Sequence, residues 1–274
     1  MKKLLISLFV LSSFVFSASL QEIQTSKKVK IGIRQKLPPF SNQDENGMSE
    51  GFEVSLAMEI AKKLVGENGE IEFVVLNAKD RIPMLESGEI DIAVANFSKT
   101  PERAKKVDFS TPYLSNTQAF ITRKADHVTN IKDLQGKRIL VTKGTTSDDW
   151  LKVNGAKYQF EVVYCPSVKE CGEQLVAEEG DGYLHTNILN AVVPLVNDST
   201  EMGVKSIGTF DYVCAGVAKG NTELLEFVNK TIYELSKGNF FKEVYNNTFE
   251  PFYRGTVDRK NLLLDDLYRV LLAE

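Results

Sequence analysis

Apolar and polar positions along the chain follow two alternating patterns. Residues 90–95 are apolar apart from Asp91, which is typical of a strand buried in a parallel sheet. Residues 51–64 place a large apolar side chain at every fourth position and stop before Gly66, which predicts an amphipathic helix. This alternation continues and predicts an α/β fold, in which mostly parallel sheets are flanked by helices. Strands are expected at 29–34, 71–76, 90–95, 118–122, 137–142, 160–164, 182–185 and 214–218. Helices are expected at 51–64, 81–86, 131–134, 187–196, 221–237 and 239–247, with further helix starts at Thr100, 144–147 and Ser167.

The turn that follows the strand at 90–95 carries the first candidate chemistry. Thr100 can cap a helix whose first position is Pro101, so strand, polar turn and helix start lie close together. Ligands of open α/β sheets bind at the carboxyl ends of strands. The hydroxyl of Ser98, free backbone amides and the guanidinium of Arg103 would suit a carboxylate there. A capped surface helix with a solvated arginine is the alternative.

A second possible anion site lies at residues 144–147, Gly-Thr-Thr-Ser. Thr145 and Thr146 would place hydroxyls and free amides at a helix start, although an ordinary capped turn has the same residues. A phosphate-binding loop is disfavoured because the Gly-Lys-Ser/Thr ending is missing.

The ends and the charge of the chain restrict its surroundings. Lys2 and Lys3 precede an apolar core at 4–16, with small residues near Ser17 and Ala18, which predicts a signal peptide cleaved near residues 17–18. No later stretch reaches about 18 consecutive apolar residues, so the mature chain is expected to be soluble and exported. The formal net charge is −4, and loss of the two leader lysines makes it −6. We therefore expect no nucleic-acid partner.

Three cysteines bear on stability rather than on metal binding. Cys165 and Cys171 are close enough in sequence to form a disulfide in an exported protein. Cys214 lies in an apolar run and is expected to be a buried free thiol. Two histidines and no Cys-x-x-Cys motif make a zinc site improbable, so we expect no metal and no cofactor.

Residues 96–103 (Asn-Phe-Ser-Lys-Thr-Pro-Glu-Arg) and 107–113 (Val-Asp-Phe-Ser-Thr-Pro-Tyr) resemble the signature of the periplasmic polar amino-acid-binding proteins of bacterial ABC importers, solute-binding protein family 3. The resemblance implies a two-lobed periplasmic binding protein of the type II Venus-flytrap class. Lobe 1 would comprise 27–112 plus 214–274, and lobe 2 would comprise 118–208, with hinges at 113–117 and 209–213. It also implies a monomer that closes on an amino acid and delivers it to a membrane permease, which is its only contact with the membrane.

The same resemblance assigns roles to individual residues. In the family, the equivalents of Ser98 and Arg103 hold the ligand α-carboxylate, and the loop at Thr145 and Thr146 meets it from the second lobe. Asn96 belongs to the same motif and is expected at the site.

Arg34 and Arg81 are the residues that suggest a particular ligand. Two further cations beside Arg103 would repel one another unless the ligand carries more than one negative charge. Their surroundings resemble the aspartate/glutamate-binding branch, in which arginines at both positions hold the side-chain carboxylate. The alternative is that each is a surface arginine.

Two departures from the family pattern leave the ligand open. Leu37 and Ala78 stand where relatives often have aromatic residues, which favours a short polar ligand. Thr186 stands where an acid usually pairs with the ligand α-ammonium, and a hydroxyl cannot neutralise a cation. Either another acid substitutes (Asp148, Asp149 or Asp211) or the ligand lacks an amine, as a simple dicarboxylate does. His185 is either a donor in the cleft or a packed histidine at a strand end.

The expected function is capture of glutamate or aspartate for an ABC importer, with a neutral polar amino acid such as cysteine, or an amine-free dicarboxylate, as alternatives. No enzyme is expected, because the common hydrolase motifs are missing. An exported dehydratase on the same fold is the alternative from another class, with His185 as its acid/base. A ligand-sensing module is a third class.

Overall fold

The computed structural model of the chain describes residues 17–34, 36–255 and 257–271. Most of the predicted signal peptide, residues 1–16, lies outside this part. The helices are α1 Leu20–Ser26, α2 Phe52–Val65, α3 Arg81–Ser87, α4 Pro101–Ala104, α5 Thr146–Asn154, α6 Val168–Val176, α7 Asn187–Asn190, α8 Val193–Val196, α9 Thr222–Lys237, α10 Phe240–Tyr253 and α11 Asp265–Leu271. The strands are β1 Lys28–Arg34, β2 Asn42–Gln43, β3 Ser49–Glu50, β4 Glu70–Leu76, β5 Ile92–Ser98, β6 Val107–Phe109, β7 Leu114–Arg123, β8 Arg138–Val141, β9 Glu161–Tyr164, β10 Gly182–Thr186 and β11 Thr200–Ala218. Short 3-10 helices lie at Lys124–Asp126, Ile131–Leu134, Gly155–Tyr158 and Arg259–Asn261.

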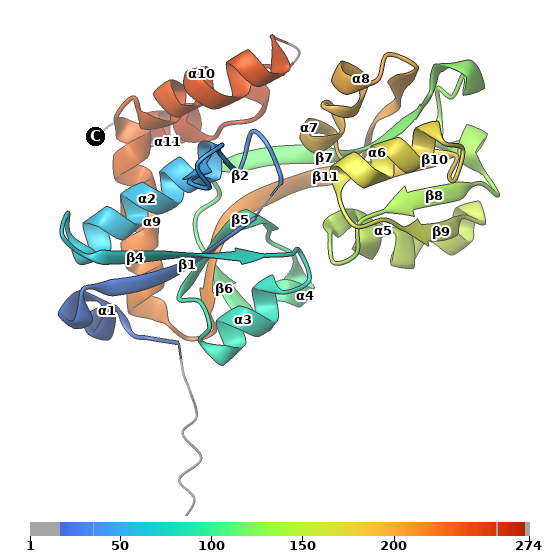
Figure 1. Cartoon of the computed structure of the whole chain (residues 1–274). Helices are drawn as coiled ribbons and strands as arrows, with labels where there is room; N and C mark the ends of the chain where they lie inside the picture. Colours follow the sequence, from blue (N-terminus) through green and yellow to red (C-terminus); the bar gives the residue numbers. More distant parts are fainter. Residues whose placement is uncertain (1–16, 35, 256, 272–274) are drawn as a thin grey trace, which may run out of the picture.

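The main sheet has the strand order β4-β1-β5-β11-β7-β10-β8-β9, with β6 paired to β11. Strands β4, β1 and β5 are parallel to one another, and so are β10, β8 and β9. The two parallel groups are joined by β11 and β7, which pair antiparallel with each other. Figure 1 shows helices packed around each group and the two long strands running from one group to the other. The predicted α/β class, with mostly parallel sheets flanked by helices, is confirmed.

The two connecting strands are longer than the sequence pattern indicated. The segments expected as hinges, 113–117 and 209–213, lie in these strands: β7 begins at Leu114, and β11 includes the whole of the second segment. Asn116 pairs with Asp211 and Ser115 with Tyr212 in this ladder. Backbone pairing across the two segments therefore maintains strand geometry where the side chains are polar. The register shifts between Ile207 and Asp211, so the ladder is irregular beside the second segment.

Helical predictions were correct in type and wrong at several boundaries. The helix expected at 187–196 is two short helices, α7 and α8, because Pro194 enters the first turn of α8 and cannot donate to the preceding turn. Helix α10 runs on to Tyr253, well past residue 247, with Pro251 inside it. Helices α1 and α11 were not predicted. Ser19 and Glu22 form a capping box at the start of α1, a signal that the sequence does contain.

The cysteines lie as predicted. Cys165 and Cys171 form a disulfide with their Cα atoms 5.3 Å apart, and Cys214 is a buried free thiol. Burial raises the pKa of Cys214 to about 12, so this thiol stays protonated and unreactive at neutral pH. In the part of the chain that the structure describes, no helix is long and apolar enough to cross a membrane.

Candidate functional site

One cavity lies where the two parallel strand groups face each other, and all nine candidate residues line it. They are Arg34, Arg81, Asn96, Ser98, Arg103, Thr145, Thr146, His185 and Thr186. The free space between these side chains is about 20 Å³, room for about one water molecule, so they must move apart to admit a solute. The carboxyl ends of β1, β5, β8 and β10 all supply residues to this cavity or to the turn beside it. The rule that ligands bind at these strand ends therefore predicted where the side chains meet.

Arg103 connects the two sides of the cavity. The Thr100 hydroxyl caps α4 by accepting the Arg103 amide at 3.2 Å, which fixes the start of the helix. The guanidinium donates to the Ser98 carbonyl at 2.9 Å, to the Gly144 carbonyl at 3.2 Å and to an Asp149 carboxylate oxygen at 3.1 Å. Burial lowers the pKa of Arg103, and Asp149 opposes that shift. Arg103 is thus a buried cation, and its ionic partner within the described residues, Asp149, is half exposed and could be exchanged for a ligand carboxylate.

The Arg81 side chain donates most of its hydrogen bonds to backbone carbonyls. Its Nε donates to the Ala78 carbonyl at 2.8 Å, and its terminal nitrogens donate to the carbonyls of Ala95 and Asn96 on β5 and of Gly144 across the cavity. The guanidinium carbon also lies 4.6 Å from the centre of the Phe97 ring. Of five N–H groups, four donate to the protein itself, so Arg81 has one left for a ligand.

Arg34 differs from Arg81 and Arg103 because one of its buried nitrogens has no acceptor in the described chain. Its Nε is buried and has no hydrogen-bond partner among the residues that the structure describes. Burial lowers the pKa of Arg34, and Glu53 partly offsets the shift. A buried N–H of a cation without an acceptor is costly, and groups of this kind commonly mark ligand sites.

Glu53 fixes the backbone of Asn96, one of the residues that line the cavity. Both of its carboxylate oxygens accept the Asn96 amide, at 2.8 and 2.9 Å, and one also accepts the Tyr113 hydroxyl. Asn96 sits at φ 49°, a left-handed conformation that asparagine tolerates better than most residues. This turn brings the Asn96 side chain to the cavity, where its Nδ2 is buried without a partner in the described chain. Burial raises the pKa of Glu53.

The start of α5 faces Arg103 from the other side. The Thr145 hydroxyl accepts the Asp148 amide at 3.2 Å and donates to the Thr142 carbonyl at 2.7 Å, so it acts as the helix cap. The Thr146 hydroxyl donates to Asp211 at 2.6 Å. Both hydroxyls are therefore already used. The amides of Thr146 and Ser147, the first two of α5, have no acceptor within the helix and remain the donors for an anion.

His185 is a neutral imidazole at the end of β10. Its Nδ1 accepts the Thr186 amide at 2.7 Å, which places the ring hydrogen on Nε2. Burial lowers the pKa of His185 to about 3, and the nearby Arg34 and Arg81 add to the shift. The imidazole is therefore a hydrogen-bond donor to the cavity rather than a base.

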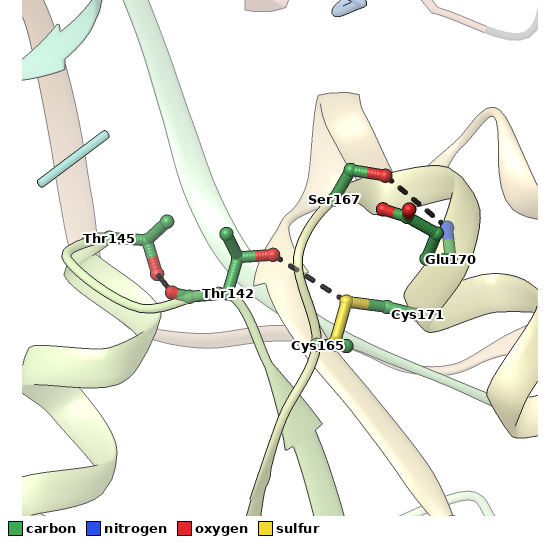
Figure 2. The surroundings of a disulfide bond; sticks show 6 residues. All are labelled: Thr142, Thr145, Cys165, Ser167, Glu170 and Cys171. Atoms are coloured by element: carbon green, nitrogen blue, oxygen red, sulfur yellow. Dashed lines mark hydrogen bonds between the residues drawn. A yellow bond between two sulfur atoms is a disulfide. The ribbon is translucent and has the colours of Figure 1, made fainter. Parts of the chain in front are cut away.

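The disulfide stands directly behind one wall of the cavity. Figure 2 shows Cys165 and Cys171 beside Thr142, whose hydroxyl donates to Sγ of Cys171 at 3.5 Å. The loop that the disulfide closes contains Ser167 and Val168, and both line the cavity. The cross-link thus anchors the segment that forms this wall.

Comparison with known proteins identifies the architecture. Residues 29–251 match the bacterial extracellular solute-binding proteins, family 3. The chain belongs to this family. Among solved structures, the solute receptor for L-cysteine of Neisseria gonorrhoeae is 31% identical, with a TM-score of 0.85, and the similarity covers 90% of this chain and 99% of that one. The cysteine-binding protein from Campylobacter jejuni is 32% identical, with a TM-score of 0.84 and coverages of 89% and 98%. A curated relative, the ABC transporter glutamine-binding protein of Bacillus subtilis, is 27% identical over 83% of each chain.

Several lining residues of this family 3 protein were not predicted. They are Lys36, Thr142, Ser167, Val168 and Leu189. Thr142 directly follows β8 and Ser167 lies three residues after the end of β9, so the same strand-end rule could have found them. Glu53, which fixes the Asn96 turn, gave no signal in the sequence because its partner is 43 positions away.

Proposed function

We propose that this protein is the periplasmic solute-binding component of an ABC importer for a small amino acid. It is exported after cleavage of its leader, captures the solute in the cavity and delivers it to a membrane permease. Membership of family 3 supports the transport role, and the names of its relatives support an amino-acid ligand. The observation that carries the proposal is that Arg103 and the start of α5 reach one cavity from opposite sides.

Binding would couple to closure of two lobes. We assign 27–112 plus 214–274 to lobe 1 and 118–208 to lobe 2, with hinges at 113–117 and 209–213. The strand order supports this division, since only β7 and β11 join the parallel groups in the sheet. A carboxylate held by Arg103 and Ser98 from lobe 1 and by the α5 amides from lobe 2 binds the closed form best, and so shifts the population toward it.

Glutamate and aspartate are the first candidates among amino acids. Arg34 supports an acidic side chain, because its buried Nε has no acceptor in the described chain. Arg81 supports it less, because the backbone already takes four of its N–H groups. Cysteine is the second candidate, supported by the similarity to two cysteine-binding structures and by the short side chains at Leu37 and Ala78.

An enzymatic role is disfavoured by the state of His185. A dehydratase needs a group that takes up a proton, whereas the acceptor nitrogen of this imidazole is occupied by the Thr186 amide and its pKa is about 3.

A thermal-shift panel of the common amino acids tests the proposal. A ligand that binds only the folded state at a hundred times its Kd stabilises it by about 2.7 kcal/mol, so Tm should rise by several degrees. Glutamate should outperform glutamine in the wild type and lose that advantage in Arg34→Gln, while Arg254→Gln, an exposed arginine, should retain it. A panel in which no amino acid and no dicarboxylate raises Tm would contradict the proposal.

A further inference from the structure

The charged side chains that line the cavity in the described chain are all positive. Four cationic side chains line it: Arg34, Lys36, Arg81 and Arg103. Among the residues that the structure describes, no acidic side chain lines it. Three of the cations are arginines, which stay protonated at physiological pH even when burial lowers their pKa.

The carboxylates closest to the lining residues already have partners. Glu53 binds the Asn96 amide and the Tyr113 hydroxyl. Asp149 is paired with Arg103 and also with Lys152. Asp211 accepts from the side chains of Thr146 and Gln118. None of these three lines the cavity.

A ligand ammonium would therefore enter as a fifth cation, and no acidic side chain of the described lining would contact it. The side chains left to receive it are hydroxyls, such as those of Ser98 and Thr186, and a hydroxyl accepts a hydrogen bond without neutralising the charge. Burying an unpaired charge is among the most costly events in a protein interior, and three buried guanidinium groups add repulsion.

Two unused donors, in contrast, suit a second carboxylate. The Nε of Arg34 and the Nδ2 of Asn96 are both buried, both without partners in the described chain, and both belong to residues that line this cavity. They come from the ends of β1 and β5, two neighbouring strands. The other carboxylate would lie between Arg103 and the first amides of α5.

We propose that the preferred solute is a small dicarboxylate without an amino group, which binds more tightly than the amino acid of the same carbon skeleton. This inference rests on the proposed function, since it uses the same cavity and the same contact between Arg103 and a carboxylate. Only the class of ligand changes, from an amino acid to a dicarboxylate without an amine. A diacid brings two negative charges to three buried cations, whereas an acidic amino acid brings the same two together with a positive charge.

Matched ligand pairs test the inference by isothermal titration calorimetry of the exported protein. Succinate is compared with aspartate, and glutarate with glutamate, because each pair differs only in the amine. We expect at least one of the two diacids to bind tenfold more tightly than its amino acid. Equal or tighter binding of both amino acids would overturn the inference and leave the proposed function intact. No binding by any of the four, or by any other amino acid, would overturn the proposed function itself.

A substitution in the cavity gives the converse test. Thr186→Asp places a carboxylate in the lining and should shift the succinate-to-aspartate preference at least tenfold toward aspartate. Thr186→Asn has nearly the shape of Asp without its charge and should shift the preference less than Thr186→Asp does, whereas Thr222→Asp, at an exposed position, should leave it as in the wild type. The inference fails if Thr186→Asn shifts the preference as far as Thr186→Asp, because size rather than charge would then decide. If Thr186→Asp does not fold, the wild-type ligand pairs decide alone.

Discussion

Reduction of the Cys165–Cys171 disulfide should lower both the stability of the protein and its affinity for the solute. The two cysteines are six positions apart, so the cross-link closes a loop of about seven residues. In the chain-entropy description, a loop of this length raises the free energy of unfolding by about 2 kcal/mol at 25 °C. For a chain of this size, that corresponds to a decrease in Tm of about 4–8 °C on reduction.

Affinity should fall because the same loop forms a wall of the cavity. Ser167 and Val168 lie between the two cysteines and line the site, and the Thr142 hydroxyl contacts Cys171 (Figure 2). Without the cross-link, the loop must be ordered when the solute binds, and that cost is subtracted from the binding free energy. If the whole 2 kcal/mol appears in binding, the Kd rises about 30-fold, which sets the upper limit.

Differential scanning calorimetry and ligand titration on the oxidised and reduced forms measure both effects. A Cys165→Ala/Cys171→Ala variant separates loss of the cross-link from the reductant, and Cys214→Ala, which removes only the buried free thiol, is the control. Mass spectrometry of alkylated peptides verifies the redox state. The reasoning is refuted if the fully reduced wild type melts within about 1 °C of the oxidised form.

Three further predictions concern the cavity. Arg103→Ala should weaken solute binding by about 2–5 kcal/mol, because it removes the charge-assisted contact at one carboxylate; titration calorimetry showing wild-type affinity in a folded variant would rule out that contact. Saturating solute should reduce the radius of gyration in small-angle scattering, and an unchanged value would argue against hinge closure. His185 has a folded-state pKa of about 3, below its unfolded value, so the unfolded state binds the extra proton and this contribution to stability is complete above about pH 6.5 and declines toward pH 3. His185→Gln should therefore show a smaller loss of Tm between pH 7 and 5 than the wild type, and an equal loss would contradict the assignment.

The order of strands and helices was predictable because each parallel strand ends in a distinct signal. Residues 90–95 are apolar and are followed by a capped helix start, and the structure places β5 and α4 there. The connecting strands gave no such signal. Ser115 and Asn116 are polar residues that became buried strand positions through pairing with β11, and that pairing depends on residues about 95 positions later in the chain.

The location of the site was predictable for the same reason, whereas its chemistry was not. Strand-end residues of one parallel group meet at one edge, so Arg34 could be placed beside Ser98, and Thr145 beside His185, without a structure. Which of their atoms remain free depends on contacts far apart in sequence. The Thr146 hydroxyl is taken by Asp211, 65 positions away, and a motif cannot reveal this.

The three arginines show why the free hydrogen-bonding atoms, and not the residue types, determine the ligand. From the sequence, Arg34, Arg81 and Arg103 are equivalent cations aimed at one site. In the structure, Arg81 is held by four backbone carbonyls, Arg103 is paired with a carboxylate that a ligand can replace, and Arg34 has a buried N–H without an acceptor. Removing Arg81 would therefore leave buried carbonyls unpaired and act mainly on stability, whereas removing Arg34 would relieve an unsatisfied donor and act mainly on affinity. Because no acidic side chain of the described chain lines the cavity, the acceptor for Arg34, and the one that replaces Asp149 on Arg103, must come from the solute.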